Sequence, residues 1–256
     1  MLELLRWMDG QATPGSSPFG AQQRRQKLSS RRWAKMAPGD SDDEGFWVRT
    51  ECGGGGDCFF RSVGVALGEP FATVRRWAAD SVTEENVDRL LAYYTHAYRA
   101  GAWDRGAITT LQTAGERRDA FRAVVGAQGG VYQGDDTTMR LLALGIAVRG
   151  LGFLVMDLRG KLHQQCFLNR GTRRVVVLVH MPGHWQLAGW VADADSDADV
   201  DVYTTFDPRA LPASLKRKLS GVGVDFLQDF ADWGARLELE GVGVGAVDAE
   251  GGDGGG

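Results

Sequence analysis

The sequence predicts an α+β fold, with helices packed on a small β-sheet, because helix-like and strand-like segments occupy separate parts of the chain. A short strand-like run, GFWVRTEC, comes first and ends at a series of glycines. Apolar residues then recur at helical spacing as far as residue 150. Beyond that point the period changes, and apolar, β-branched runs indicate strands.

Several helices are expected in the middle of the chain. The first begins at Cys58, where CFFRSVGVALG has the composition of a buried helix. We expect Thr83 to cap the helix at residues 82–98, and Asp136 or Thr137 to cap the one at residues 135–150. Helical spacing of apolar residues predicts helices at residues 71–82, 82–98, 116–126 and 135–150.

The strands of the second half are expected at residues 152–158, 173–181, 184–192 and 200–208. From these patterns we divide the chain into four regions. The folded domain spans residues 45–193, after a disordered N-terminal arm over residues 1–44 that is rich in polar and charged residues. An extension over residues 194–240 packs on the core, and residues 241–256 form a disordered, glycine-rich tail.

Composition excludes several classes of protein. The 256 residues carry a net charge of −4, which argues against a nucleic-acid-binding surface along the whole chain. No apolar run has the length that crosses a membrane. With only 3 cysteines, a disulfide framework is not expected. We therefore expect an intracellular protein, cytoplasmic or nuclear, that functions as a monomer without a cofactor.

The segment GGGGDCFFRS places Cys58 between a glycine loop and a helix. The unpaired N–H groups and the dipole of a helix N-terminus favour a thiolate, so this position is expected to lower the pKa of a cysteine. Glycines allow close approach of the backbone to a substrate, and their N–H groups can form an oxyanion hole. Cys58 is therefore the candidate nucleophile, although a free cysteine is also a common core residue.

A cysteine nucleophile needs a base, and the chain offers 4 histidines. His184 follows the turn Met181-Pro182-Gly183 and opens the strand-like run HWQLAGWV, so it is expected at the rim of the sheet. We expect Trp185 to pack beside it. His184 is the preferred base, and His180 at the end of VVVLVHM is the alternative.

The segment GGGGDCFFRSV resembles the nucleophile motif of the ovarian-tumour (OTU) family of cysteine proteases, usually Gly-Asp-Gly-Asn-Cys-Leu-Phe-Arg-Ala. FWVRTEC before it, VYQGDDTTMRLLALGIAVRGLGFLVMD in the middle and GHWQLAGWV near the end resemble further family segments in the same order. The resemblance covers residues 46 to 192. It implies a papain-like OTU fold, with the catalytic domain at residues 45–193.

The resemblance implies a deubiquitinase, a thiol-dependent hydrolase that cleaves the isopeptide bond after the C-terminal glycine of ubiquitin. The expected partner is ubiquitin, polyubiquitin or a ubiquitin-like modifier. Cys58 would be the nucleophile and His184 the general base. Gly55, Gly56 and Asp57 would form the oxyanion and tail loop, and Trp185 would line the substrate channel.

Two positions depart from the family pattern. The family usually has an aspartate three residues before the cysteine, where this chain has Gly55. The residue that orients the histidine usually lies two positions after it as Asn or Asp, and here it is Gln186, with Asp207 as a remote alternative. Because of these departures, an OTU-like module that binds ubiquitin without cleaving it is an alternative to an active enzyme.

A metal site at Cys52 and Cys58, or at His163 and Cys166, is a further alternative, although the spacing of these residues is unlike that of common zinc sites.

Overall fold

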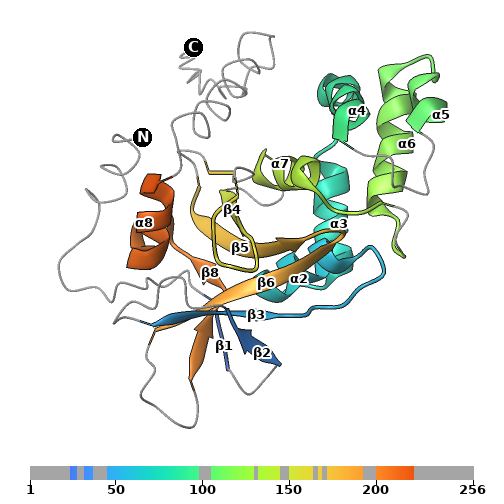
Figure 1. Cartoon of the computed structure of the whole chain (residues 1–256). Coiled ribbons are helices and arrows are strands. Elements are labelled where there is room, and N and C mark those ends of the chain that lie inside the picture. The colour runs from blue at the N-terminus through green and yellow to red at the C-terminus, as the bar shows by residue number, and fades with distance from the viewer. Residues whose placement is uncertain are drawn as a thin grey trace, which may run out of the picture.

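The computed structural model describes residues 24–27, 32–36, 45–97, 105–129, 132–144, 150–163, 167–168, 172–192 and 200–221. Helices and a twisted β-sheet form separate layers, so the predicted α+β class is confirmed (Figure 1). Most of the helices cover one side of the sheet, and helix α8 lies on the other side (Figure 1). No described helix is both long enough and apolar enough to cross a membrane.

The helices expected in the middle of the chain are confirmed, with starts within two residues of the expected ones, and residues 98 and 145–149 of the expected ranges lie outside the described residues. They are α2 (Cys58–Leu67), α3 (Phe71–Asp80), α4 (Glu84–Ala97), α6 (Ala114–Gly126) and α7 (Asp136–Leu144). A further helix, α5 (Arg105–Thr109), is too short to show a periodic apolar face in the sequence. The cap of α7 is Asp135, whose Oδ1 accepts from the Thr138 N–H at 3.0 Å, and not Asp136 or Thr137.

The sheet is mixed, and its central strand is β6 (His184–Val191). Strand β3 (Phe46–Thr50) pairs antiparallel with one edge of β6. The other edge pairs with β5 (Arg174–Met181) near the start of β6 and with β7 (Asp201–Tyr203) near its end. Strand β4 (Leu151–Met156) runs parallel to β5, and β8 (Thr205–Phe206) pairs antiparallel with it. The strands predicted from the sequence are therefore present.

Two short strands lie in the region expected to be a disordered arm. Strand β1 (Arg25–Lys27) pairs with β7, and β2 (Trp33–Lys35) pairs with β3. For these residues the expectation of disorder is wrong, because the sheet supplies the backbone hydrogen bonds that a polar segment of this length cannot form alone. The rest of residues 1–44 falls outside the described residues, apart from Arg24, Arg32 and Met36.

The C-terminal extension contributes β7, β8, the 3-10 helix η3 (Pro208–Ala210) and α8 (Ala213–Gly221). Its contact with the core includes a hydrogen bond from the Trp47 indole Nε1 to Ser214 Oγ at 3.2 Å. The extension and the N-terminal strands are thus part of the same sheet as residues 45–193. The predicted tail at residues 241–256 lies outside the described residues.

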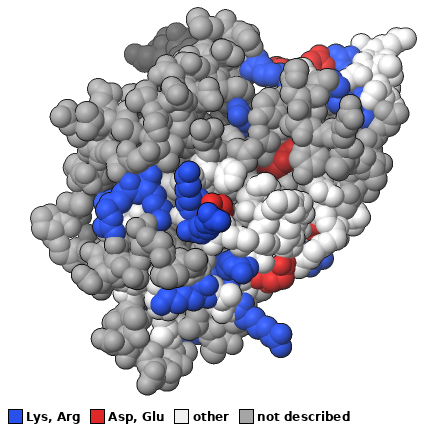
Figure 2. Space-filling view, viewed as in Figure 1, with Lys and Arg blue, Asp and Glu red and all other residues white. Residues whose placement is uncertain are grey.

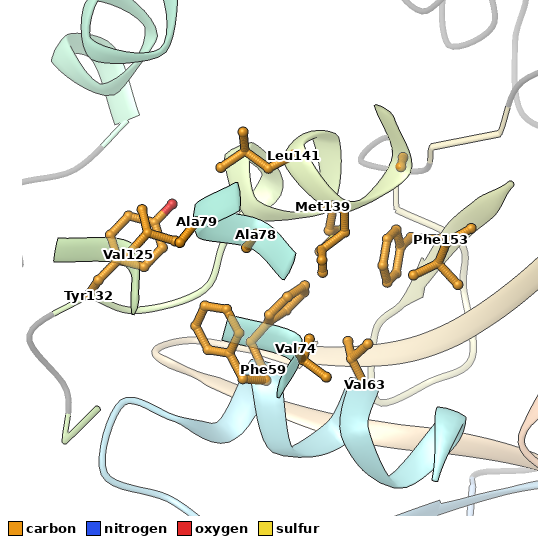
Figure 3. Close-up of a cluster of buried hydrophobic side chains, with 14 of the residues drawn as sticks. Phe59, Val63, Val74, Ala78, Ala79, Val125, Tyr132, Met139, Leu141 and Phe153 are labelled. Carbon is orange, nitrogen blue, oxygen red and sulfur yellow. The ribbon is translucent and has the colours of Figure 1, made fainter. Parts of the chain in front are cut away.

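Both faces of the sheet are buried, which explains the nearly continuous apolar runs of β4 and β5. Alternate residues of β5 point to opposite cores: Val176 and Leu178 pack with the larger helical layer, and Val175, Val177 and Val179 pack on the side of α8. In the larger core, side chains from α2, α3, α7 and β4 converge (Figure 3), among them Phe59, Val63, Val74, Ala78, Met139, Leu141 and Phe153.

The surface charge of the described residues is uneven. In the orientation of Figure 2, lysine and arginine side chains gather over the sheet and α8, with few carboxylates between them. The net charge of the whole chain is −4, whereas basic side chains predominate on the described part of this face.

We predict that Gly64→Ala in α2 destabilises the protein, although alanine is the better helix former by about 1 kcal/mol. A Cβ at Gly64 would lie 2.6 Å from the backbone oxygen of Glu69, in the tight turn that closes the helix. We expect a loss of about 1–3 kcal/mol, the range typical of overpacking, measured by urea denaturation.

The matched control is Gly126→Ala at the end of α6, where the nearest atom to the new Cβ is the Ala79 Cβ at 3.9 Å. This change should stabilise the protein by about 0.4–1 kcal/mol, because it lowers the entropy of the unfolded chain without a clash. Equal effects of the two substitutions would contradict the packing of α2.

Candidate active site

The N-terminus of α2 and the start of β6 form the candidate site, because the helix packs against this strand. The rings of Phe59 and Trp185 meet edge to face with centroids 5.6 Å apart, and Ser62 Oγ donates to the Trp185 backbone oxygen at 3.5 Å. Cys58, the first residue of α2, therefore lies beside Trp185, the residue after His184. The predicted nucleophile and base come from segments more than a hundred residues apart and lie in the same region.

The Cys58 thiol is buried and has backbone N–H groups around it. Burial raises the pKa of Cys58, while hydrogen bonds from the backbone N–H groups of Trp185, Phe59 and Cys58 itself lower it. The negative charge of Glu51 also raises it, and the net change is upward. The expectation that the helix N-terminus lowers this pKa is therefore wrong as a net effect: the helix N–H groups do stabilise the thiolate, but desolvation outweighs them.

His184 contacts a carboxylate that the sequence patterns did not single out. His184 Nε2 lies 2.6 Å from Glu51 Oε2, and the side chains of these residues are 24% and 52% exposed. Gln186, the expected orienting residue, donates from Nε2 to Glu51 Oε2 at 3.2 Å and accepts from Arg49 at 2.6 Å. Among the described contacts, Gln186 reaches His184 only through Glu51.

The other proposed partners of the histidine lie elsewhere. Asp207 follows β8, which pairs with β5 at Val175 and Val176, whereas His184 pairs with Met181 at the opposite end of β5. Asp207 is therefore far from His184, and the remote alternative is wrong. His180, the alternative base, stacks on the Trp185 ring with centroids 4.4 Å apart. Burial and the charge of His163 lower the pKa of His180.

The Trp185 side chain belongs mainly to the core. It is 6% exposed, and its indole Nε1 donates to the Gly134 backbone oxygen at 2.8 Å. Its backbone N–H is the group that faces the thiol. The role of Trp185 in a substrate channel stays a prediction.

The loop before Cys58 is held from inside by a buried ion pair. Asp57 Oδ1 accepts from Arg75 Nε at 2.8 Å and from Arg75 Nη2 at 2.5 Å, and Asp57 Oδ2 accepts from the Gly129 N–H at 3.2 Å. Burial lowers the pKa of Arg75, and the hydrogen bond and charge of Asp57 oppose this change. The side chain of Asp57 thus points into the core, and only its backbone belongs to the surface of the loop.

The glycines of the loop have the backbone conformation that their residue type favours. Gly55 and Gly56 have φ of 76° and 83°, in the left-handed region. A Cβ at Gly54 or Gly55 would meet no atom within 4 Å, so the outer side of the loop is open.

Glu51 is the main site residue that the sequence did not reveal. It occupies the end of GFWVRTEC, and its side-chain partners His184 and Gln186 are 133 and 135 residues away. No local spacing encodes such a contact, and only the pairing of β3 with β6 could have indicated it.

The described residues contain no group of three or more histidine, cysteine, aspartate or glutamate side chains that could hold a metal ion. The sulfur of Cys52 contacts the Thr50 backbone oxygen at 3.8 Å. Cys166, part of the second metal alternative, lies outside the described residues.

Comparisons with known proteins give distant structural similarities. No protein-family model matches the sequence, and no curated protein matches it. An OTU domain solved in complex with ubiquitin is similar over 81% of this chain and 95% of its own, with 12% identity and a TM-score of 0.42. The viral OTU protease from Farallon virus is similar over 64% of this chain and 99% of its own, with 15% identity and a TM-score of 0.41.

The raised pKa of Cys58 predicts slow alkylation by iodoacetamide at neutral pH. The rate should rise as the pH increases, with a midpoint above the ordinary pKa of a cysteine, because only the thiolate reacts. The measurement is the pH dependence of Cys58 modification by peptide mass spectrometry, which separates it from the other two cysteines. A midpoint below the ordinary value would show that the helix N-terminus and His184 together lower the pKa of Cys58 more than burial raises it.

The buried pair Arg75–Asp57 predicts strong destabilisation when one partner is removed. Asp57→Asn or Arg75→Met should each lower the free energy of unfolding by about 3–5 kcal/mol, because a buried charge loses its counter-charge. The double variant should lose clearly less than the sum. In urea denaturation the exposed pair Arg117–Asp88 provides the control, and Asp88→Asn should change stability far less.

Proposed function

We propose that the chain is a cysteine isopeptidase that hydrolyses the bond after the C-terminal glycine of ubiquitin or a ubiquitin-like modifier. The observation that carries this proposal is the position of Cys58, at a helix N-terminus that packs against the start of the strand opened by His184. Nucleophile, candidate base and glycine loop are thereby gathered at one end of the sheet. This combination supports acyl transfer through a covalent thioester.

In the proposed reaction, His184 takes the proton of Cys58, since burial keeps the thiol protonated at neutral pH. The sulfur attacks the carbonyl carbon of the terminal glycine and forms a tetrahedral oxyanion. His184 then donates a proton to the leaving lysine amine as the carbon–nitrogen bond breaks. Water, activated by the same imidazole, hydrolyses the thioester and regenerates the thiol.

The oxyanion requires hydrogen-bond donors at the loop. The backbone N–H of Cys58, with amides of Gly55 and Gly56, is the set we assign to this role. The left-handed conformation of both glycines permits a loop with N–H groups turned toward one point. The buried Asp57–Arg75 pair supports this loop from within, in place of the aspartate that the family pattern has at position 55.

The open outer side of the glycine loop supports a substrate with a slim extended end. The resemblance of the Cys58 segment to the OTU motif makes the Gly-Gly tail of ubiquitin the proposed occupant. A ubiquitin-binding module without turnover is the second candidate. Two observations favour it: the pKa of Cys58 is raised, and Gly55 and Gln186 depart from the family pattern.

The test is labelling with ubiquitin that carries a cysteine-reactive electrophile at its C-terminus. We expect one adduct, mapped to Cys58, which Cys58→Ala abolishes and the control Cys52→Ala retains. His184→Ala should slow labelling about 10²- to 10⁴-fold, the usual contribution of a general base. Tight ubiquitin binding without an adduct would establish the binding module, and neither binding nor adduct would contradict ubiquitin as the substrate.

A further inference from the structure

The Glu51 carboxylate connects the candidate base to the glycine loop. Its Oε2 lies 2.6 Å from His184 Nε2 and accepts from Gln186 Nε2 at 3.2 Å, and its Oε1 accepts from the Gly53 N–H at 3.0 Å. Both oxygens are therefore engaged. Burial alone would raise the pKa of Glu51, but the hydrogen bonds from Gln186, His184 and Gly53 outweigh it, so the net change is downward and the carboxylate is ionised at neutral pH.

We propose that Glu51 is the positioning residue for His184 and holds the imidazole with its proton on Nε2, so that Nδ1 is the basic nitrogen. An ionised carboxylate can only accept, so the short contact assigns the donor role to Nε2. The lone pair is then on Nδ1, which under the proposed function is the nitrogen that takes the Cys58 proton. This inference rests on the proposed function, and it adds a residue that the OTU resemblance did not indicate.

Arg49 and Gln186 fix the carboxylate in turn. Arginine has no acceptor, so the 2.6 Å contact requires the Gln186 Oε1 to face Arg49 and its NH₂ group to face Glu51. Gln186 is 7% exposed, which limits its side chain to this arrangement. The order of contacts is Arg49, Gln186, Glu51 and His184.

Strand pairing explains why these four side chains meet. The register pairs Thr50 with Leu187, so the next position places residue 51 opposite residue 186. Glu51 and Arg49 alternate along one segment, and His184 and Gln186 alternate along the other, so all four share one face of the sheet. Trp185 and Leu187 point to the opposite face and pack in the larger core with α2.

The charge of Glu51 also acts on the nucleophile, whose pKa it raises. The described charged and titratable groups near this carboxylate include His184 on β6, which contacts it, and Cys58 on α2, whose pKa it raises. Arg49 in β3 reaches it through Gln186, and His180 on β5 contacts the Trp185 ring. Removal of this negative charge stabilises the thiolate, so the alkylation of Cys58 should shift to lower pH.

Two variants separate the hydrogen bond from the charge. Glu51→Gln keeps an acceptor and removes the charge, and Glu51→Ala removes both. Since the Glu51 side chain is 52% exposed, both variants should fold, which urea denaturation checks. Glu69→Gln is the matched control, because Glu69 is an exposed residue beyond the other end of α2.

The first measurement is the ¹⁵N spectrum of the His184 ring, assigned with a His184→Asn variant. In the wild type at alkaline pH we expect the Nε2–H tautomer, and in Glu51→Ala a mixture. The second is the pH profile of Cys58 alkylation, which should move to lower pH in Glu51→Gln and Glu51→Ala but not in Glu69→Gln. Neither experiment uses ubiquitin, so both test the inference even if the proposed substrate is wrong.

The third measurement is the rate of labelling by the ubiquitin electrophile. Glu51→Ala should slow it about 10- to 100-fold, as a misplaced catalytic group does, with ubiquitin binding unchanged. A wild-type His184 with its proton on Nδ1 would overturn the proposal. A Glu51→Ala variant with the wild-type tautomer and alkylation profile would overturn it as well, and in that case Glu51 would be a surface carboxylate without influence on the site.

Discussion

The buried guanidinium of Arg75 is the constraint on which the candidate site depends. It is 0% exposed, and it stacks 3.9 Å from the Phe60 ring centroid. Its donors reach Asp57 before α2, the Val125 backbone oxygen at the end of α6 and the Tyr132 backbone oxygen before α7. A buried charge needs well-placed acceptors, so the observed arrangement of these segments satisfies the guanidinium, and a displacement of any of them would remove an acceptor. That arrangement fixes where α2 begins, and hence where the thiol lies.

The site divides between two faces of β6. Trp185 and Leu187 point into the larger core, and the backbone N–H of Trp185 contacts the thiol from that strand. His184 and Gln186 belong to the other set of alternate residues and join Glu51. A single strand thus supplies the packing surface for the helix that begins at Cys58 and the polar groups around His184. A shift of one residue in its pairing would exchange these roles.

The parts of the structure that local patterns encode were predictable. The helix at Cys58, the strand opened by His184 and the α+β order follow from periodicity and from the Pro182-Gly183 turn. The roles of Glu51 and Arg75 could not be predicted, because their partners are distant in sequence and their side chains are ordinary surface types. The raised pKa of Cys58 could not be predicted either, because the sequence indicates the helix N-terminus but not how deeply the thiol is buried.

The long separation between the halves of the site has a consequence for biosynthesis. Glu51 and His184 are 133 residues apart, and Ser62 and Trp185 are 123 residues apart. A ribosome that adds about 5–20 residues per second makes the Cys58 segment several seconds before it adds His184. During that interval the nascent chain carries Glu51 without its contact to His184 and strand β3 without its partner β6. The contacts that join the Cys58 segment to the start of β6 can therefore form only after the second half of the chain has been made.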